Sequence, residues 1–184
     1  MRFDTFLSLT AIFDRWPVEY GKIIQMLLAI SFDPCRGGFA VENHFSEGVD
    51  LELIRPTERF AVEVKTTEGA YFTLNEKDTS GLETKSQNDG YTPAVAVLRR
   101  WKLAEWVIGN AQRLPTGSHT CDRLALDSIP ELESLARTHF ERAVAELKDR
   151  VLSPPTGAPL DFLGTVLKTE SRLRVDNGRE FVAR

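Results

Sequence analysis

Apolar and polar positions alternate most regularly between residues 49 and 65. The run 49–54 alternates apolar and acidic side chains over its first five positions, and the run 60–65 alternates again. A period of two is typical of strands that bury one face. The residues Arg-Pro-Thr-Glu at 55–58 suit a turn between the two runs, so the pattern predicts a β-hairpin.

Helical spacing of apolar residues precedes this hairpin. Pro17 and Glu19 suit the first turn of a helix, and the apolar run that follows predicts a helix over 17–32. The apolar residues 93–98 predict a buried strand. The other expected elements are a strand at 39–45, a strand or loop at 71–74, a partial helix at 75–88, a strand or short helix at 103–108, and a loop at 114–120.

A second long helix is predicted near the C-terminus. Ser128 with Glu131 three residues later is typical of a helix N-cap, and an apolar stripe continues to about Arg150. The residues expected to be buried along it are Leu132, Leu135, Phe140, Val144 and Leu147.

The length fits one domain with an appended C-terminal part. Residues 153–157 resemble a linker, because they combine serine, proline and glycine, and the tail from residue 160 is expected to be a short mixed appendage. We therefore divide the chain into a core over 1–127 and a C-terminal helix, linker and tail over 128–184.

Composition places the chain among ordinary globular proteins. It is 42% hydrophobic and 27% charged, and its net charge of −4 does not by itself favour a polyanionic partner. Cys35 and Cys121 are far apart and lack a metal-ligand spacing, which indicates a reduced, cytoplasmic setting. The apolar run 23–32 is too short to cross a bilayer, and the N-terminus lacks a convincing targeting signal, so we expect a soluble protein.

Three charged residues of the hairpin suggest a site. Glu63 and Lys65 share one face of their strand, and Asp50 is expected beside them, at one sheet edge, on the neighbouring strand. The opposite, buried face would carry the intervening apolar residues Val49, Leu51, Leu53, Val62 and Val64. Carboxylates are ligands that Mg²⁺ prefers, and a nearby ammonium can position the attacking water and stabilise charge on a phosphate.

The pattern Gly-Val-Asp50 followed by Glu63-Val-Lys65 resembles the PD-(D/E)XK nuclease superfamily, which includes restriction endonucleases and archaeal Holliday-junction resolvases. The order of the elements also matches over about residues 17–108. Val49 stands where the motif has proline, a common variation. The resemblance implies an α/β fold with a restriction-endonuclease-like core, a mixed central β-sheet flanked by helices, here with a C-terminal helical extension.

The resemblance also implies roles for individual residues. Asp50 and Glu63 would ligate Mg²⁺, or Mn²⁺ as a substitute, together with the main-chain carbonyl of Val64. Lys65 would orient the nucleophilic water. Glu19, on the first helix, would be an outer-shell or second-metal ligand. The implied function is a metal-dependent endonuclease that hydrolyses phosphodiester bonds, with DNA as the expected substrate. Many such nucleases act as homodimers, so a homodimer is expected.

Neighbouring residues leave alternatives open. Glu52 is either a spare ligand or a solvated strand position, and His44 either assists the site or lies in a surface loop. Arg99, Arg100 and Lys102 either contact phosphates, with Trp101 stacking beside them, or form a solvated strand end. The competing functions are a catalytically inactive module that binds nucleic acid or a protein partner, and a scaffold whose acidic hairpin is only surface.

Overall fold

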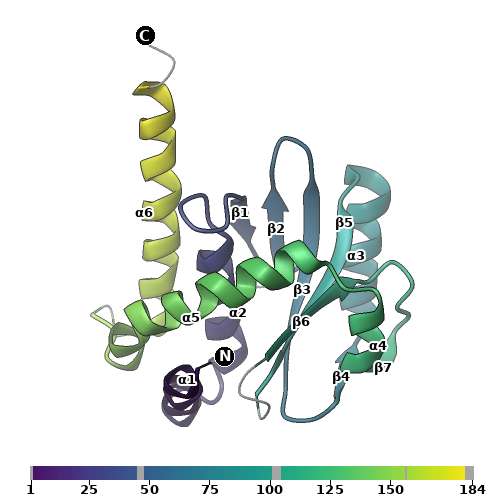
Figure 1. The fold of residues 1–184 in the computed structure, drawn as a ribbon, viewed down its shortest axis with the longest axis horizontal. Coiled ribbons are helices and arrows are strands. Elements are labelled where there is room, and N and C mark those ends of the chain that lie inside the picture. Colours follow the sequence, from purple (N-terminus) through teal and green to yellow (C-terminus); the bar gives the residue numbers. More distant parts are fainter. Residues whose placement is uncertain (1, 45–47, 101–104, 156, 181–184) are drawn as a thin grey trace.

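The computed structural model describes residues 2–44, 48–100, 105–155 and 157–180, with side chains as far as residue 169 (Figure 1). Within these ranges, no helix is both long enough and apolar enough to span a membrane.

The centre of the molecule is a mixed five-stranded sheet with the strand order β1-β2-β3-β5-β6. The pair β3 and β5 is parallel, and every other neighbouring pair is antiparallel. A separate antiparallel pair is formed by β4 and β7. The strands are β1 (Ala40–Asn43), β2 (Leu51–Ile54), β3 (Arg59–Thr67), β4 (Tyr71–Leu74), β5 (Thr92–Arg99), β6 (Glu105–Asn110) and β7 (Gly117–Thr120).

Helices cover both faces of this sheet (Figure 1). On one face lie α2 and α5, with α1 and α6 packed against them, and on the other lie α3 and α4. The helices are α1 (Phe3–Arg15), α2 (Tyr20–Phe32), α3 (Glu76–Asp89), α4 (Cys121–Leu126), α5 (Pro130–Leu152) and α6 (Pro159–Glu180). The predicted class, a mixed sheet flanked by helices with a C-terminal helical extension, is confirmed.

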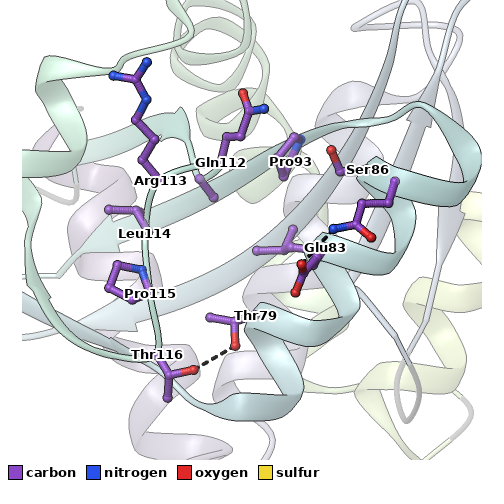
Figure 2. A pocket seen from close by; sticks show the side chains of 12 residues that line it. Thr79, Glu83, Ser86, Pro93, Gln112, Arg113, Leu114, Pro115 and Thr116 are labelled. Carbon is purple, nitrogen blue, oxygen red and sulfur yellow. Dashed lines mark hydrogen bonds between the residues drawn. The ribbon is translucent and has the colours of Figure 1, made fainter.

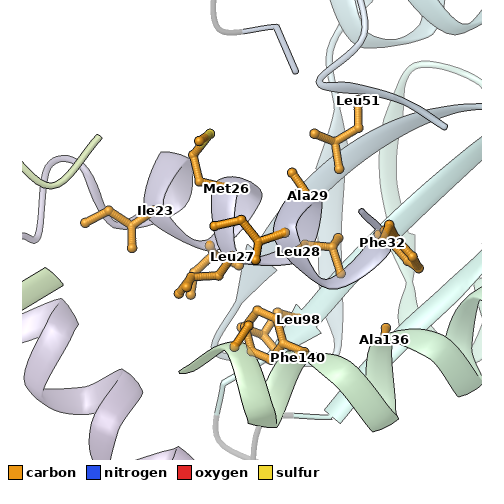
Figure 3. Packing of buried hydrophobic residues seen from close by; sticks show 14 of the residues in the cluster. Ile23, Met26, Leu27, Leu28, Ala29, Phe32, Leu51, Leu98, Ala136 and Phe140 are labelled. Atoms are coloured by element: carbon orange, nitrogen blue, oxygen red, sulfur yellow. The ribbon is translucent and has the colours of Figure 1, made fainter. Parts of the chain in front are cut away.

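The larger core is built around α2, which is apolar on almost every side. Figure 3 shows Leu27 and Leu28 of this helix between the sheet and Phe140 of α5. The Phe140 ring also meets the Trp106 ring of β6 edge-on, with 5.1 Å between their centroids. Because α2 contacts α1, α5, α6 and the sheet, it is buried as completely as a strand in the centre of a sheet, and its hydrophobic pattern has no polar face.

The predicted hairpin is confirmed, but one of its faces was assigned incorrectly. Leu51 pairs with Val62 across the antiparallel β2 and β3, and the Arg55 amide closes the turn onto the Glu58 carbonyl. Val49, however, packs with α3 and α4 rather than with α2. It precedes the first residue of β2, so the strict alternation of the strand does not extend to it.

Several boundaries differ from the predicted ones. The first predicted helix begins at Tyr20 rather than residue 17, and α1 precedes it. Ser128 does not cap α5: it forms a bridge with Gly109, and Ile129 is the residue before the helix. The stretch predicted as a loop contains β7, and the tail predicted as an appendage forms α6, whose Phe162 and Leu163 are buried in the larger core. The division of the chain at residue 127 stays a prediction.

Gly81 sets how closely α3 approaches the segment that precedes β2. A Cβ at Gly81 would lie 2.9 Å from the Gly48 carbonyl oxygen, closer than packed atoms tolerate, and Gly48 itself has a φ of 71°. We therefore expect Gly81→Ala to destabilise the protein by about 1–3 kcal/mol, the usual cost of overpacking. Urea denaturation measures this change.

Gly21→Ala is the matched control for that substitution. Gly21 is also a helical glycine, and nothing lies within 4 Å of the position that its Cβ would take. Alanine there is expected to stabilise the protein by roughly 0.5–1 kcal/mol through helix propensity. Equal effects of the two substitutions would contradict the close contact between α3 and Gly48.

Candidate active site

The three motif residues come together on the side of the sheet that α3 and α4 cover. The pairing of Leu51 with Val62 places Asp50, just before β2, beside Glu63 in β3. Alternation along β3 then puts Lys65 on the same face as Glu63. Since β3 is the third of five strands, the group lies in the interior of the sheet and not at the predicted sheet edge.

Asp50 is held by the backbone of the neighbouring strand. Its Oδ2 accepts a hydrogen bond of 2.8 Å from the Val64 amide, and its side chain is also hydrogen-bonded to that of Glu63. Burial raises the pKa of Asp50, although the Val64 amide and the charge of Lys65 oppose this shift. The carboxyl is half-buried, so it can reach a ligand from solvent.

Glu63 is a buried acid next to another acid. Its relative exposure is 5%. Burial, followed by the negative charge of Asp50, raises the pKa of Glu63 to about 8, in spite of a 2.8 Å hydrogen bond from Lys65 Nζ. Burial and the neighbouring Asp50 thus favour the neutral form of Glu63, in spite of its contact with Lys65.

Lys65 is placed between two carboxylates. Its Nζ lies 2.8 Å from Glu63 Oε1 and 2.7 Å from Asp78 Oδ2. Burial alone would lower the pKa of Lys65, but the hydrogen bonds to Asp78 and Glu63 raise it above its ordinary value. The ammonium thus remains charged, and its side chain is 22% exposed, which leaves it accessible from solvent.

Asp78 is a residue of this group that the sequence did not reveal. It occupies the third position of α3, where its side chain accepts from the Asn75 amide while Asn75 caps the Asp78 amide. Burial acts to raise the pKa of Asp78, but hydrogen bonds from Lys65 and Asn75 bring it below its ordinary value. The Asn-x-x-Asp capping pattern marks a helix start in the sequence, but its contact with Lys65 arises only from packing.

The donor set fits a small, hard divalent cation. Asp50 and Glu63 present adjacent carboxyl oxygens, and a cation bound there would offset the repulsion between the two acids. Val64, whose main-chain carbonyl is the third predicted ligand, lies between Glu63 and Lys65 in β3. The roles predicted for these groups as ligands stay predictions.

Glu19 is the fourth predicted residue of the site. It is half-buried at the start of α2, where its carbonyl accepts from the Ile23 amide. Gln25, one and a half turns further along the helix, is the residue that reaches the strand segment: its Nε2 donates to the carbonyls of His44 and Asp50 over 2.7 and 3.1 Å. Gln25 thus helps to fix the Asp50 backbone, and the role of Glu19 stays a prediction.

A second group of metal-type ligands lies on β1 and β2. The ligand atoms of Glu42, His44 and Glu52 are all within 4.8 Å of one another. Lys85 Nζ, however, lies 2.9 Å from Glu52 Oε1, and this ion pair helps to lower the pKa of Glu52 despite its burial. Both groups thus contain a lysine paired with a buried acid, but the pKa of Glu52 is lowered, whereas burial and Asp50 raise the pKa of Glu63 in spite of Lys65.

A groove of about 760 Å³ lies on another side of α3 and contains none of the motif residues (Figure 2). It runs between α3 and the segment 111–116, and Thr79 hydrogen-bonds Thr116 across it over 2.8 Å. The groove shares only the helix with the candidate site.

The basic cluster at the end of β5 is occupied by protein contacts. Arg100 pairs with Glu68 over 2.7 Å and stacks on the Phe13 ring, and Arg99 lies 3.8 Å from Asp122. Lys102 and Trp101, the other members of the predicted cluster, lie outside the described residues. A role in phosphate binding stays a prediction.

No protein-family model and no curated protein matches this chain. Among solved structures, it is similar to Hjc, a Holliday junction resolvase from the archaeal hyperthermophile Archaeoglobus fulgidus, with a TM-score of 0.44 and 20% identity over 54% of this chain and 89% of that one.

Proposed function

We propose that this chain is a Mg²⁺-dependent endonuclease that hydrolyses phosphodiester bonds in DNA. The observation that supports it is the arrangement of Asp50, Glu63 and Lys65, in which two adjacent carboxyl groups lie beside an ammonium held by carboxylates. A buried acid pair is costly for folding unless it binds something, and a divalent cation relieves the repulsion between the two acids.

Each residue has a defined task in this proposal. Asp50 and Glu63, with the Val64 carbonyl, would hold the cation, which would supply Lewis acidity at a phosphate oxygen and lower the pKa of a bound water. Two of the three N–H donors of Lys65 are used by Glu63 and Asp78, so the third can bind the attacking water or a phosphate oxygen. The charge of Lys65 then stabilises the negative charge that develops on the phosphate.

Cleavage assays test the proposal directly. Purified protein is incubated with plasmid, single-stranded DNA and RNA in Mg²⁺ or Mn²⁺, and the products are separated by electrophoresis. We expect metal-dependent cleavage of DNA. Mobility shifts without cleavage would instead indicate an inactive binding module, and absence of both cleavage and metal binding would contradict the enzyme. The predicted homodimer is checked by sedimentation of the same sample.

Lys65→Ala is expected to lower the cleavage rate by about 10²-fold or more, because it removes a donor that acts on developing charge. Lys168→Ala, an exposed lysine on α6, is the control and is expected to cleave at the wild-type rate. Circular dichroism of both variants verifies that the loss does not arise from unfolding. Retention of activity by Lys65→Ala would contradict the assigned role.

A further inference from the structure

Asp78 reaches the candidate site from outside the motif. Its exposure is only 6%, and one oxygen, Oδ2, accepts both from Lys65 Nζ over 2.7 Å and from the Asn75 amide over 2.9 Å. A helix-capping aspartate needs only the second contact and usually remains in solvent. The burial of this carboxylate against a lysine of the motif therefore requires a further explanation.

The backbone around Asp78 is fixed from two directions. The reciprocal hydrogen bonds with Asn75 set the first turn of α3. One turn later, the close approach of Gly81 to Gly48 fixes the same helix against the segment that leads into Asp50. Asp78 is consequently a rigid acceptor, and its position relative to Lys65 is determined by the helix rather than by a flexible side chain.

Asp78 contacts both Lys65 and one of the proposed ligands: it accepts from Lys65 Nζ over 2.7 Å, and its side chain is also hydrogen-bonded to that of Glu63. In the part of the chain that the structure describes, Asp50, Glu63 and Asp78 do not form a mutually close group of the kind found for Glu42, His44 and Glu52. Lys65 Nζ bonds both Glu63 and Asp78. If Glu63 directed its oxygens to a cation, Lys65 would lose one partner and Asp78 would remain as the other.

We propose that Asp78 is a positioning residue of the site, which keeps the Lys65 ammonium in place when Glu63 is engaged by a metal ion. The expected effect of Asp78 on cleavage rests on the proposed nuclease function. The hydrogen bond by which Asp78 orders Lys65 does not depend on turnover. Asp78 touches neither the substrate nor the cation in this arrangement.

Asp78→Asn is the central variant, because asparagine retains an acceptor for the Asn75 amide but removes the negative charge. Asn75→Ala removes the helix cap and leaves the Asp78 carboxylate, and Glu83→Gln makes the same charge change at an exposed position of α3. Each variant is measured for thermal stability, for Mn²⁺ affinity by calorimetry, for kcat and KM, and for the NMR signal of the Lys65 ammonium.

For Asp78→Asn we expect Mn²⁺ affinity within about threefold of wild type, kcat lower by roughly 10–100-fold and KM within about threefold, in the range of a charged hydrogen bond to a catalytic group. The slowly exchanging ammonium signal of Lys65 should be present in the wild type and lost in this variant. Asn75→Ala loses only the side-chain cap, while its amide still donates to Asp78 and Gly81 still packs against Gly48. This variant should therefore lose thermal stability but retain the ammonium signal and most of kcat, and Glu83→Gln should behave as wild type.

Other outcomes overturn the inference in recognisable ways. A tenfold or larger loss of Mn²⁺ affinity in Asp78→Asn would make Asp78 a ligand. Equal losses of kcat in Asp78→Asn and Asn75→Ala would make it a helix cap only. If the wild type cleaves no nucleic acid, the proposed function fails, while the ammonium signal and the metal affinity still decide whether Asp78 orders Lys65.

Discussion

Asp50→Asn is expected to lower DNA cleavage by roughly 10³-fold, or about 4 kcal/mol of transition-state stabilisation, and to abolish Mg²⁺ binding at this site. The Asp50 carboxylate is accessible and lies beside Glu63, so its charge is the part of the donor set that a cation needs most. Asparagine can still accept the hydrogen bond from the Val64 amide, and the fold should therefore survive. Single-turnover cleavage and calorimetry with Mg²⁺ measure the two effects.

Glu52→Gln is the control for this prediction. Glu52 is a buried acid on β2, two residues after Asp50, and it belongs to the second group of metal-type ligands. We expect this variant to cleave DNA at a rate within about threefold of wild type, since Glu52 is assigned no part in the reaction. If Glu52→Gln lost most of its DNA cleavage while Asp50→Asn retained it, the active site would lie at the group of Glu52 and not at Asp50.

Glu63→Gln is expected to change stability and activity in opposite directions. The folded state favours neutral Glu63, because its pKa rises from the ordinary value of 4.5 to about 8. The neutral Glu63 side chain therefore makes its full contribution to the free energy of unfolding below pH 4.5. This contribution is lost as the pH rises from 4.5 to about 8, because Glu63 ionises in the unfolded chain before it ionises in the folded one. Glutamine does not ionise, so the Glu63→Gln variant does not lose this stability as the pH rises. The metal-free variant should therefore be more stable than wild type at pH 8, by about 1–3 kcal/mol.

The same substitution removes a ligand, and cleavage should fall by about 10²–10³-fold. Urea denaturation in EDTA at pH 5 and pH 8, beside a cleavage assay, measures both effects. Glu83→Gln, an exposed position on α3, should leave both quantities at their wild-type values. Destabilisation of the metal-free Glu63→Gln variant at pH 8 would show instead that Glu63 is ionised and pairs with Lys65.

The alternation of apolar and polar residues was sufficient to predict the strands that carry the site. Alternation defined β2 and β3, and their pairing then placed Asp50 beside Glu63, as predicted. The apolar run that forms β5 is buried on both faces, which is typical of a central strand and explains why the site lies inside the sheet rather than at its edge.

The contacts made by α3 and α2 could not be predicted in the same way. The capping pattern at Asn75 and Asp78 indicates where α3 begins, but the partner of Asp78 depends on how the helix packs over β3. Gln25 lies within a helix that is buried on nearly every side, so periodicity offers no face from which to infer its contact with the Asp50 carbonyl. Both contacts join segments that are remote in the sequence.

The location of a bound metal ion tests the central claim most directly. Crystals grown with Mn²⁺ would reveal the ion by its anomalous scattering. The account predicts a peak within coordination distance of the Asp50 and Glu63 carboxylates and the Val64 carbonyl, and its loss in Asp50→Asn. A peak only at Glu42, His44 and Glu52, or no peak at either group, would contradict it.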